Sequence, residues 1–414
     1  MAIAAGAVIR GIFVFSLLHT PGFSWQWGGE AASIASAIVR GEGFSSPYNV
    51  STGPTVLMAP IYPSYLSSLL YVAHNPQRAA AMAVGLNVLW SVLVCLPLWA
   101  IAESHRPRFG YIAAGFWALA PLSGYSEVVY FWDTSLYTLT LVLLMWATLK
   151  LRADLPARVW AGYGVFAGLT LLLDPAHSLA WTVALAALTF VRRFRWRCVA
   201  VALAATVVTI APWCVRNSMV LHRPAYIRGH VGYELLRGLT SDPFDRGTAF
   251  ASNPGRNEAE LSSFKELGET AYMRARGAEA WGLLLRRPFG AVVRQTMRRI
   301  FVYWTGTSEI RYLYKPAGRF VWLKYLCYTL VGAFALFGTF TLAWFKRDVR
   351  LLTLAVAFLG VFPLPYYVAL SDPRYRAPIE PLCYILAIVG FAPYIASRAE
   401  NRLASNRESQ FEYG

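Results

Sequence analysis

The chain has 414 residues, of which 57% are hydrophobic and 14% are charged. A soluble globular domain has about 45–50% apolar and about 25% charged residues, so this composition excludes an ordinary soluble domain and favours a membrane protein. The formal net charge is +16. The basic residues lie between apolar blocks or in one long loop, not in a stripe interleaved with aromatic residues, so nucleic acid is not expected as a partner.

Ten apolar stretches predict an all-α, polytopic membrane protein, because a helix of about 17 to 25 apolar residues crosses a bilayer. The first stretch lacks a basic beginning and contains Arg10, so we expect a retained helix rather than a cleaved signal peptide. The stretches are residues 3–19, 80–102, 109–125, 134–149, 159–173, 176–191, 198–213, 320–344, 351–370 and 379–395.

The loops between these stretches differ in charge. Loops 103–108, 150–158, 192–197 and 346–350, with the tail from residue 398, carry fifteen lysines and arginines. The opposite loops carry four when the long loop is left aside: Arg40, Arg78, Arg374 and Arg376. Cytoplasmic loops are enriched in basic residues, so both termini are expected in the cytoplasm, and an even number of spans agrees with this.

The sequence predicts four regions. Residues 1–213 form a seven-span module with a first outer loop at 20–79, residues 214–319 form a long extra-cytoplasmic loop, residues 320–397 form three further spans, and residues 398–414 form a cytoplasmic tail. Within the long loop, residues 288–304 place apolar residues among arginines at helical spacing. This pattern predicts a helix, lying either on an anionic membrane surface or on the loop's own fold.

Glu30 stands at the start of a predicted short helix in the first outer loop. In residues 30–40, Ile34 and Ile38 share one side at helical spacing. A carboxylate at a helix start is favoured by the helix dipole, so Glu30 is either a capping charge or a functional acid.

Several short motifs resemble those of a known family. Glu30 is followed by residues 41–47 (GEGFSSP), 53–55 (GPT) and 60–63 (PIYP). Further along are Trp132-Asp133-Thr134, Pro212-Trp213 with Arg216-Asn217, and residues 373–381 (PRYRAPIEP). Together, in this order, they resemble bacterial GT-C membrane glycosyltransferases related to protein O-mannosyltransferases and lipid A aminoarabinose transferases. The chain departs from the usual pattern at Gly238-Leu239 and Asp174-Pro175.

The resemblance implies a GT-C-like bundle of about ten spans whose two long outer loops contain interfacial helices. It also implies a multi-pass protein of the bacterial inner membrane, with an active site facing the periplasm or exterior. The enzyme would transfer a sugar, with inversion, from a polyprenyl-phosphate donor to a lipid, glycan or protein acceptor. The sequence does not specify the sugar, the acceptor, the polyprenyl length or the oligomeric state.

This reaction needs a carboxylate to take the acceptor's proton and cations to stabilise the departing phosphate. The resemblance assigns the carboxylate to Glu30. Arg374 and Arg376 are candidates for the phosphate because guanidinium groups bind it bidentately, although arginines near helix ends also anchor proteins at headgroups. Arg216 is a further candidate.

Other residues receive supporting roles. We expect Asp133 to cap its helix or orient Glu30, and Asp174 to cap the turn before Pro175. Substrate or supporting contacts are expected from Trp132, Tyr62 and Tyr375, and sugar stacking is open to Trp25 and Trp27. No cofactor is expected, but a divalent metal stays open, because relatives that make N-linked glycans use acidic residues with one. The pair Glu127 and Asp133 alone is weak evidence for such a metal site.

Two other functions fit a polytopic chain of this size: a transporter or flippase of lipid-linked sugar, and a non-catalytic partner in a membrane assembly. Transporters tend to have repeated halves and polar residues at mid-membrane. This chain instead concentrates its charge in two outer loops, which favours the enzyme.

Overall fold

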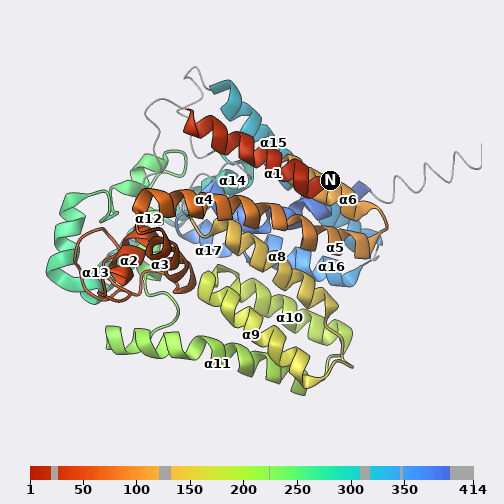
Figure 1. Ribbon diagram of the computed structural model, residues 1–414, viewed down its shortest axis with the longest axis horizontal. Helices are drawn as coiled ribbons and strands as arrows, with labels where there is room; N and C mark the ends of the chain where they lie inside the picture. Colours follow the sequence, from red (N-terminus) through yellow and green to blue (C-terminus); the bar gives the residue numbers. More distant parts are fainter. Residues whose placement is uncertain (20–26, 121–131, 223, 308–317, 346–347, 392–414) are drawn as a thin grey trace, which may run out of the picture.

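The structure is a computed structural model that describes residues 1–19, 27–120, 132–222, 224–307, 318–345 and 348–391. The described chain is almost entirely helical (Figure 1). Its extended pairing is limited to two isolated bridges, Ser45 with Pro54 and Asp242 with Asp245. The prediction of an all-α protein is confirmed.

Every predicted span is helical over most of its described residues. The helix at residues 380–391 continues to the end of the described chain. Residues 121–125 of the third predicted span and residues 392–395 of the tenth lie outside the described residues. The helices are α1 Ala2–Leu18, α4 Pro76–Leu93, α5 Cys95–His105, α6 Phe109–Leu119, α8 Thr134–Lys150, α9 Ala157–Leu173, η1 Pro175–His177, α10 Ser178–Arg192, α11 Trp196–Leu221, α15 Gly318–Phe345, α16 Val349–Ala355 and the π-helix η4 Val356–Val361.

Four stretches of the described chain are long and apolar enough to cross a membrane: Pro76–His105, Trp196–Leu221, Trp322–Phe345 and Val349–Val368. They indicate an integral membrane protein. The helices α1, α6, α8 and α9 are apolar but shorter. Ten spans, and the orientation of the chain in the membrane, therefore stay predictions.

Small residues allow several of these helices to pack closely, as is common between membrane helices. A Cβ atom on Gly164 of α9 would collide with the carbonyl oxygen of Ala202 in α11. A Cβ on Gly338 of α15 would collide with the carbonyl oxygen of Leu386. Substitution at either glycine would therefore separate the two backbones.

The buried Arg10 fixes α1 to its neighbours. Its Nε donates to Ser91 Oγ of α4 at 2.8 Å, and its Nη1 donates to the carbonyl of Ala118 in α6 at 3.1 Å. A charge in an apolar region is costly unless it is hydrogen-bonded, and these bonds compensate for it.

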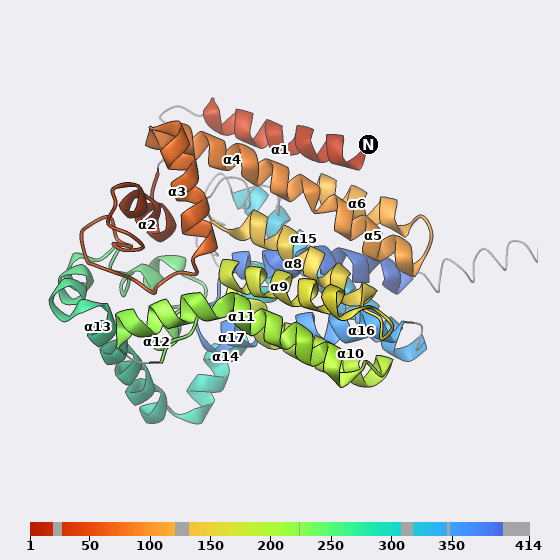
Figure 2. The same cartoon turned by 60° about the horizontal axis from the view of Figure 1, so that its bottom comes forward.

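The loop elements gather at one end of the long helices. Figure 2 shows α2, α3, α12 and α13 grouped at that end. The elements are α2 Glu30–Val39, α3 Ile61–Ala73, α12 Val231–Thr240, η2 Arg246–Phe250, α13 Glu258–Arg286, α14 Phe289–Thr305 and η5 Pro373–Ile379. The short helix α17 Leu364–Val368 ends the candidate span Val349–Val368. The helices predicted to start at Glu30 and to cover residues 288–304 are thus confirmed as α2 and α14.

Candidate functional site

Glu30 is the first residue of α2, directly after Gly29, whose φ of 83° lies in the left-handed region that favours glycine. The start of the helix is held by Trp27, whose Nε1 donates to the Ala32 carbonyl at 3.2 Å and to Ser36 Oγ at 2.9 Å. The residues that follow Glu30 in α2 are mostly buried, including Ile34 one turn later on the same face. The Glu30 side chain is therefore carried on a fixed helix end.

The charge of Glu30 acts on groups from three distant segments. Burial raises the pKa of the Tyr48 hydroxyl, and Tyr233 and Glu30 add to this rise. Burial likewise raises the pKa of Tyr233, with a small contribution of the same sign from Glu30. Burial opposes the charge of Arg374, but Tyr375, Asp372 and Glu30 help to raise its pKa above the ordinary arginine value. Glu30 thus contributes to the pKa of Arg374, and the roles predicted for these two residues stay predictions.

Arg374 lies between aromatic rings. Its guanidinium carbon is 4.1 Å from the centre of the Trp132 ring and 4.9 Å from that of Tyr375. Its Nη2 donates to the Tyr375 hydroxyl at 3.1 Å, and Tyr375 stacks on Tyr366 with ring centres 4.5 Å apart. These contacts hold the guanidinium plane in one orientation.

Arg228 joins two carboxylates next to this group. Its Nη2 lies 3.2 Å from Asp174 Oδ2 and 3.7 Å from Asp133 Oδ2. Burial opposes the charge of Arg228, but Asp174 and Asp133 outweigh it and raise its pKa. Sequence reasoning missed Arg228, because it is one of many arginines in the long loop and stands in no motif.

The two aspartates behave differently as caps. Asp174 Oδ1 accepts from the Ala176 amide at 2.8 Å, which confirms the predicted cap before Pro175. Asp133 precedes α8 but makes no capping hydrogen bond, because its backbone is already helical at φ −65° and ψ −6°. The predicted capping role of Asp133 is therefore wrong, and its role in orienting Glu30 stays a prediction. Burial, followed by the charge of Asp174, raises the pKa of Asp133 to about 7.

Unpaired polar atoms collect around Asp133. Within the described chain, Tyr62 Oη, Arg228 Nε and Arg374 Nε are buried and make no hydrogen bond. All three residues interact with the charge of Asp133. Buried polar groups are almost always hydrogen-bonded, so this cluster marks a place where a polar ligand or water would find partners.

Arg376 has different neighbours from Arg374. It has no exposed surface, and its Nη2 donates to Glu380 Oε1 at 2.8 Å. Its Nη1 donates to the carbonyls of Trp304 at 2.8 Å and Tyr328 at 2.9 Å. Arg376 therefore connects the last outer loop to α14 and α15, and its predicted role at the phosphate is not tested by these contacts.

Arg216 holds the first outer loop. It donates to the carbonyls of Phe44 and Thr55, at the two sides of the Ser45–Pro54 bridge. Its guanidinium also lies 4.9 Å from the centre of the Trp213 ring. These bonds use the guanidinium for the protein's own backbone, and its role at the phosphate also stays a prediction.

The long loop contacts the first outer loop through Glu269, a residue to which the sequence analysis assigned no role. Glu269 Oε1 accepts from the Val56 amide at 2.8 Å, and the Gly229 amide donates to the Val56 carbonyl at 3.2 Å. Beside them, the rings of Tyr48 and Phe264 meet edge to face at 5.1 Å. The segment that follows Glu30 is thus fixed between α11, α12 and α13.

A metal site is not evident among the described residues, where no three His, Cys, Asp or Glu side chains form a group suited to a metal ion. Asp133 and Asp174 are paired with Arg228 instead. Glu127 and Trp25 lie outside the described residues. The expectation that no metal is required therefore stays a prediction.

Comparison with known proteins gives a match in fold alone. No family model matches the chain, and no curated protein matches its sequence. The crystal structure of the Archaeoglobus fulgidus oligosaccharyltransferase tethered with an acceptor peptide containing the NVT sequon matches with a TM-score of 0.55 and 13% identity, over 96% of this chain and 49% of that one. Its apo form matches with a TM-score of 0.50 and 13% identity, over 98% of this chain and 51% of that one.

The chain spans about half the length of the solved oligosaccharyltransferase. Over nearly all of its own length, its fold resembles the transmembrane part of that GT-C membrane glycosyltransferase. This likeness agrees with the fold class predicted from the sequence.

Proposed function

We propose that the chain is a membrane glycosyltransferase that transfers a sugar from a polyprenyl-phosphate donor to an extra-cytoplasmic acceptor, with inversion at the anomeric carbon. The observation that carries the proposal is the cluster in which Arg374 stacks on Trp132, Arg228 pairs with Asp174, and both arginines keep an unpaired buried Nε. Glu30 contributes to the raised pKa of Arg374 in this cluster. The likeness in fold to the oligosaccharyltransferase supports the class.

In the proposed reaction, an oxygen or nitrogen of the acceptor attacks the anomeric carbon of the donor sugar. A bond from the acceptor to that carbon forms while the bond from the carbon to the phosphate oxygen breaks. The acceptor's proton passes to the Glu30 carboxylate, and polyprenyl phosphate leaves with the electron pair of the broken bond. The charge on the sugar ring in the transition state resembles that in glycoside hydrolysis.

We assign the phosphate to Arg374. Its raised pKa keeps the guanidinium charged, and its unpaired Nε has a hydrogen bond to offer. A planar guanidinium held by aromatic rings loses little freedom when it binds phosphate bidentately. Arg228 lies nearby with a second unpaired Nε, so it supports this charge. We assign Arg376 and Arg216 to holding the site together.

The aromatic residues around Glu30 and Asp133 suit a sugar. Burial raises the pKa of Tyr48, so its hydroxyl stays neutral and can donate to a sugar oxygen or to Glu30. The Tyr233 hydroxyl donates to the Ser252 carbonyl at 3.0 Å and can accept a hydrogen bond from the sugar. Tyr62, with its unpaired hydroxyl, and Trp132 lie on the Asp133 side. We place the donor sugar between Tyr48 on the Glu30 side and Tyr62 with Trp132 on the Asp133 side.

The acceptor stays open among a lipid, a glycan and a protein. The proposed location is the bacterial inner membrane, with the site facing the periplasm or exterior and both termini in the cytoplasm. The excess of basic residues in the loops at the other end of the helices supports this orientation.

A transfer assay tests the proposal. Purified protein in nanodiscs receives a radiolabelled polyprenyl-phosphate sugar and a membrane extract as the source of acceptor. Glu30→Gln should lower turnover by about 10²- to 10⁴-fold, because it removes the proton acceptor, while donor binding is retained. The matched control is Glu42→Gln, since Glu42 lies in the same loop but pairs with Arg40 on the surface. It should turn over like the wild type.

Two results would contradict the proposal. One is full turnover by Glu30→Gln. The other is a wild-type protein that moves no sugar to any acceptor in the extract but translocates the labelled lipid across a bilayer, which would establish the transporter.

A further inference from the structure

One arginine of the helix α14 is buried against the rest of the protein. Arg299, only 3% exposed, donates to the carbonyls of Gly238, Tyr367 and Val368. Val302 and Tyr303 on the same side are also buried. A helix on a protein surface in water ordinarily buries apolar residues and exposes charges, so the opposite side of α14 is of interest.

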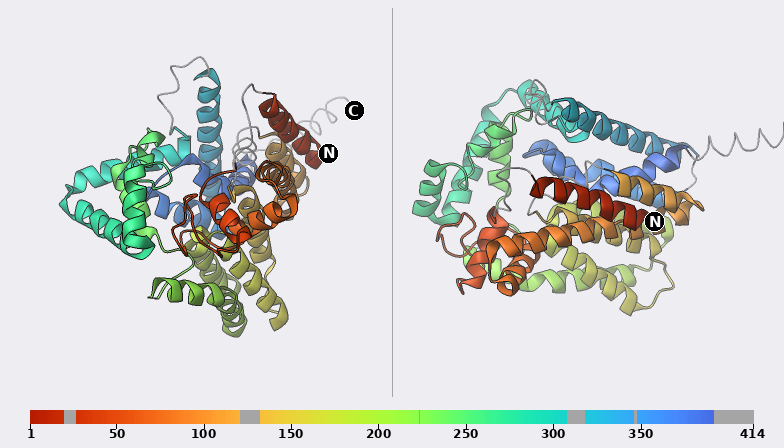
Figure 3. Two further views of the ribbon diagram at one scale, coloured as in Figure 1. Left: turned by 60° about the vertical axis from the view of Figure 1, so that its left-hand side comes forward. Right: turned by 45° about the horizontal axis from the view of Figure 1, so that its top comes forward.

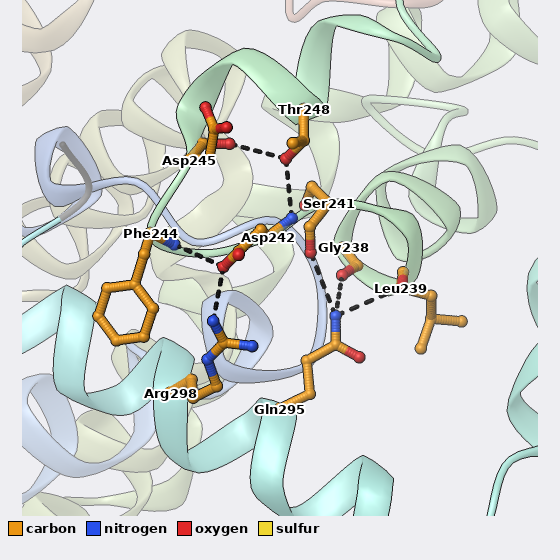
Figure 4. A network of polar contacts seen from close by, with 9 residues as sticks. All are labelled: Gly238, Leu239, Ser241, Asp242, Phe244, Asp245, Thr248, Gln295 and Arg298. Atoms are coloured by element: carbon orange, nitrogen blue, oxygen red, sulfur yellow. Dashed lines mark hydrogen bonds and ion pairs between the residues drawn. The ribbon is translucent and has the colours of Figure 1, made fainter. Parts of the chain in front are cut away.

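Hydrogen bonds connect α14 to the last turn of α12 and to the residues that follow it (Figure 4). Gln295 Nε2 donates to the Gly238 carbonyl at 2.9 Å and lies within 3.4 Å of the Leu239 and Ser241 carbonyls. Arg298 Nη2 donates to Asp242 Oδ1 at 2.9 Å. Because several side chains fix the rotation of α14, its outward side is determined by the fold.

The outward side is apolar. Phe289 is 83% exposed and Met297 is 57% exposed, and Val293 lies between them one turn from each. Phe301 continues the same row. Leu285, at the end of α13, is 81% exposed beside Phe289. Exposed apolar patches of this kind mark sites that bind a protein partner or a membrane.

Two arginines border this apolar row. Arg286 lies at the corner between α13 and α14, and Arg294 lies within α14, both exposed. Among the described residues, neither forms an ion pair. An apolar row flanked by unpaired arginines is complementary to a bilayer surface with anionic headgroups.

The position of α14 fits such a surface. It packs against α15, which contains the candidate span Trp322–Phe345 and exposes Trp322, Leu323 and Leu326. Figure 3 (left view) shows α13 and α14 projecting sideways from the bundle. The apolar row is therefore an extension of the surface that the bundle presents to lipid.

We infer that the corner between α13 and α14, with the outward side of α14, is a binding site for anionic phospholipid at the membrane surface. In this arrangement Leu285, Phe289 and Met297 insert among the acyl chains, while Arg286 and Arg294 bind lipid phosphates. This inference does not depend on sugar transfer.

A labelling experiment tests the insertion. The full chain is placed in nanodiscs of phosphatidylcholine and phosphatidylglycerol and treated with a membrane-impermeant maleimide. Met297→Cys should react about tenfold more slowly than Arg274→Cys, because acyl chains exclude the charged reagent. Arg274 is an exposed residue of α13 outside the row. The unsubstituted chain gives the background of the five native cysteines.

Equal rates for the two variants in nanodiscs would overturn the inference. If Met297→Cys reacts freely in nanodiscs but is protected in native membranes, a protein covers this surface and the inference is also overturned.

A second measurement tests the charge. Native mass spectrometry counts phosphatidylglycerol molecules retained by the protein after partial delipidation. The double variant Arg286→Gln/Arg294→Gln should lose retained phosphatidylglycerol, whereas the control Arg256→Gln/Arg274→Gln, which removes two exposed arginines elsewhere in the long loop, should keep it. Unchanged retention in the first variant would contradict the assignment to anionic lipid.

Discussion

The guanidinium carbon of Arg374 lies 4.1 Å from the centre of the Trp132 ring, so the last outer loop packs against a residue two positions before α8. A guanidinium over a tryptophan ring is stabilised by both stacking and cation–π attraction. The Nη2 of Arg374 also donates a hydrogen bond to the Tyr375 hydroxyl. These contacts keep the Arg374 guanidinium in a fixed position with its Nε unpaired, where the charge of Glu30 contributes to its pKa.

Replacing this arginine with lysine should impair donor binding. Arg374→Lys keeps the positive charge but loses the planar fork and the ring stacking. We expect the apparent donor KM to rise about tenfold or more, because one charge-assisted hydrogen bond is worth about 1.5–3 kcal/mol. Arg78→Lys, on the exposed surface of α4, is the control. Donor saturation curves for both variants check this, and an unchanged KM for Arg374→Lys would remove it from the phosphate site.

Stability should depend strongly on the buried pair of Arg376 and Glu380, whose Nη2 and Oε1 are 2.8 Å apart. Arg376→Met leaves an uncompensated carboxylate in the interior, which costs about 3–5 kcal/mol. The double variant Arg376→Met/Glu380→Leu removes both charges and should recover much of the apparent Tm. Thermal denaturation in detergent measures this. Equal losses in the single and double variants would show that the pair does not act as a unit.

The pH dependence of stability should change at Asp133. Its pKa is raised from 3.8 to about 7, so between these values the folded protein holds a proton that the unfolded chain has released. Stability should therefore fall as the pH rises from about 4 to about 7 and then level off. In Asp133→Asn this contribution is absent, so its Tm should fall less over the same range. Parallel Tm profiles for the variant and the wild type would contradict the raised pKa.

Loss of Glu269 should loosen the first outer loop. Glu269→Ala leaves the buried Val56 amide without its acceptor, which costs about 1–3 kcal/mol. Glu269→Gln keeps an oxygen in the same place. Amide hydrogen exchange at residues 55–58 should be faster in Glu269→Ala than in the wild type, and nearly unchanged in Glu269→Gln. Equal exchange in all three proteins would mean that Glu269 does not hold the loop.

Local patterns allowed most of the helices to be predicted from the sequence. The start of α2 at Glu30 and the extent of α14 follow from spacing and composition, because both depend on neighbouring residues. The Asp174 cap follows from Asp before Pro for the same reason. The capping role of Asp133 was wrong because its backbone enters the helical region one residue earlier than the pattern suggests.

Contacts between distant segments were not accessible in this way. Arg228 approaches Asp133 and Asp174 only after the long loop folds back over α8 and η1. Arg374 and Arg376 are two residues apart and look equivalent in the sequence. In the 3-10 helix η5, with three residues per turn, residues two apart point to different sides. One guanidinium therefore meets Trp132, while the other meets Glu380.

The central claim is that Glu30 and Arg374 act on one donor molecule. A cryo-electron microscopy structure of the wild-type protein in a nanodisc, with a non-hydrolysable polyprenyl-phosphonate sugar bound, tests it most directly. We predict that the phosphonate oxygens lie within hydrogen-bonding distance of Arg374 and that the anomeric carbon faces Glu30. A phosphonate bound away from Arg374, or a sugar with Glu30 remote from its anomeric carbon, would contradict the account.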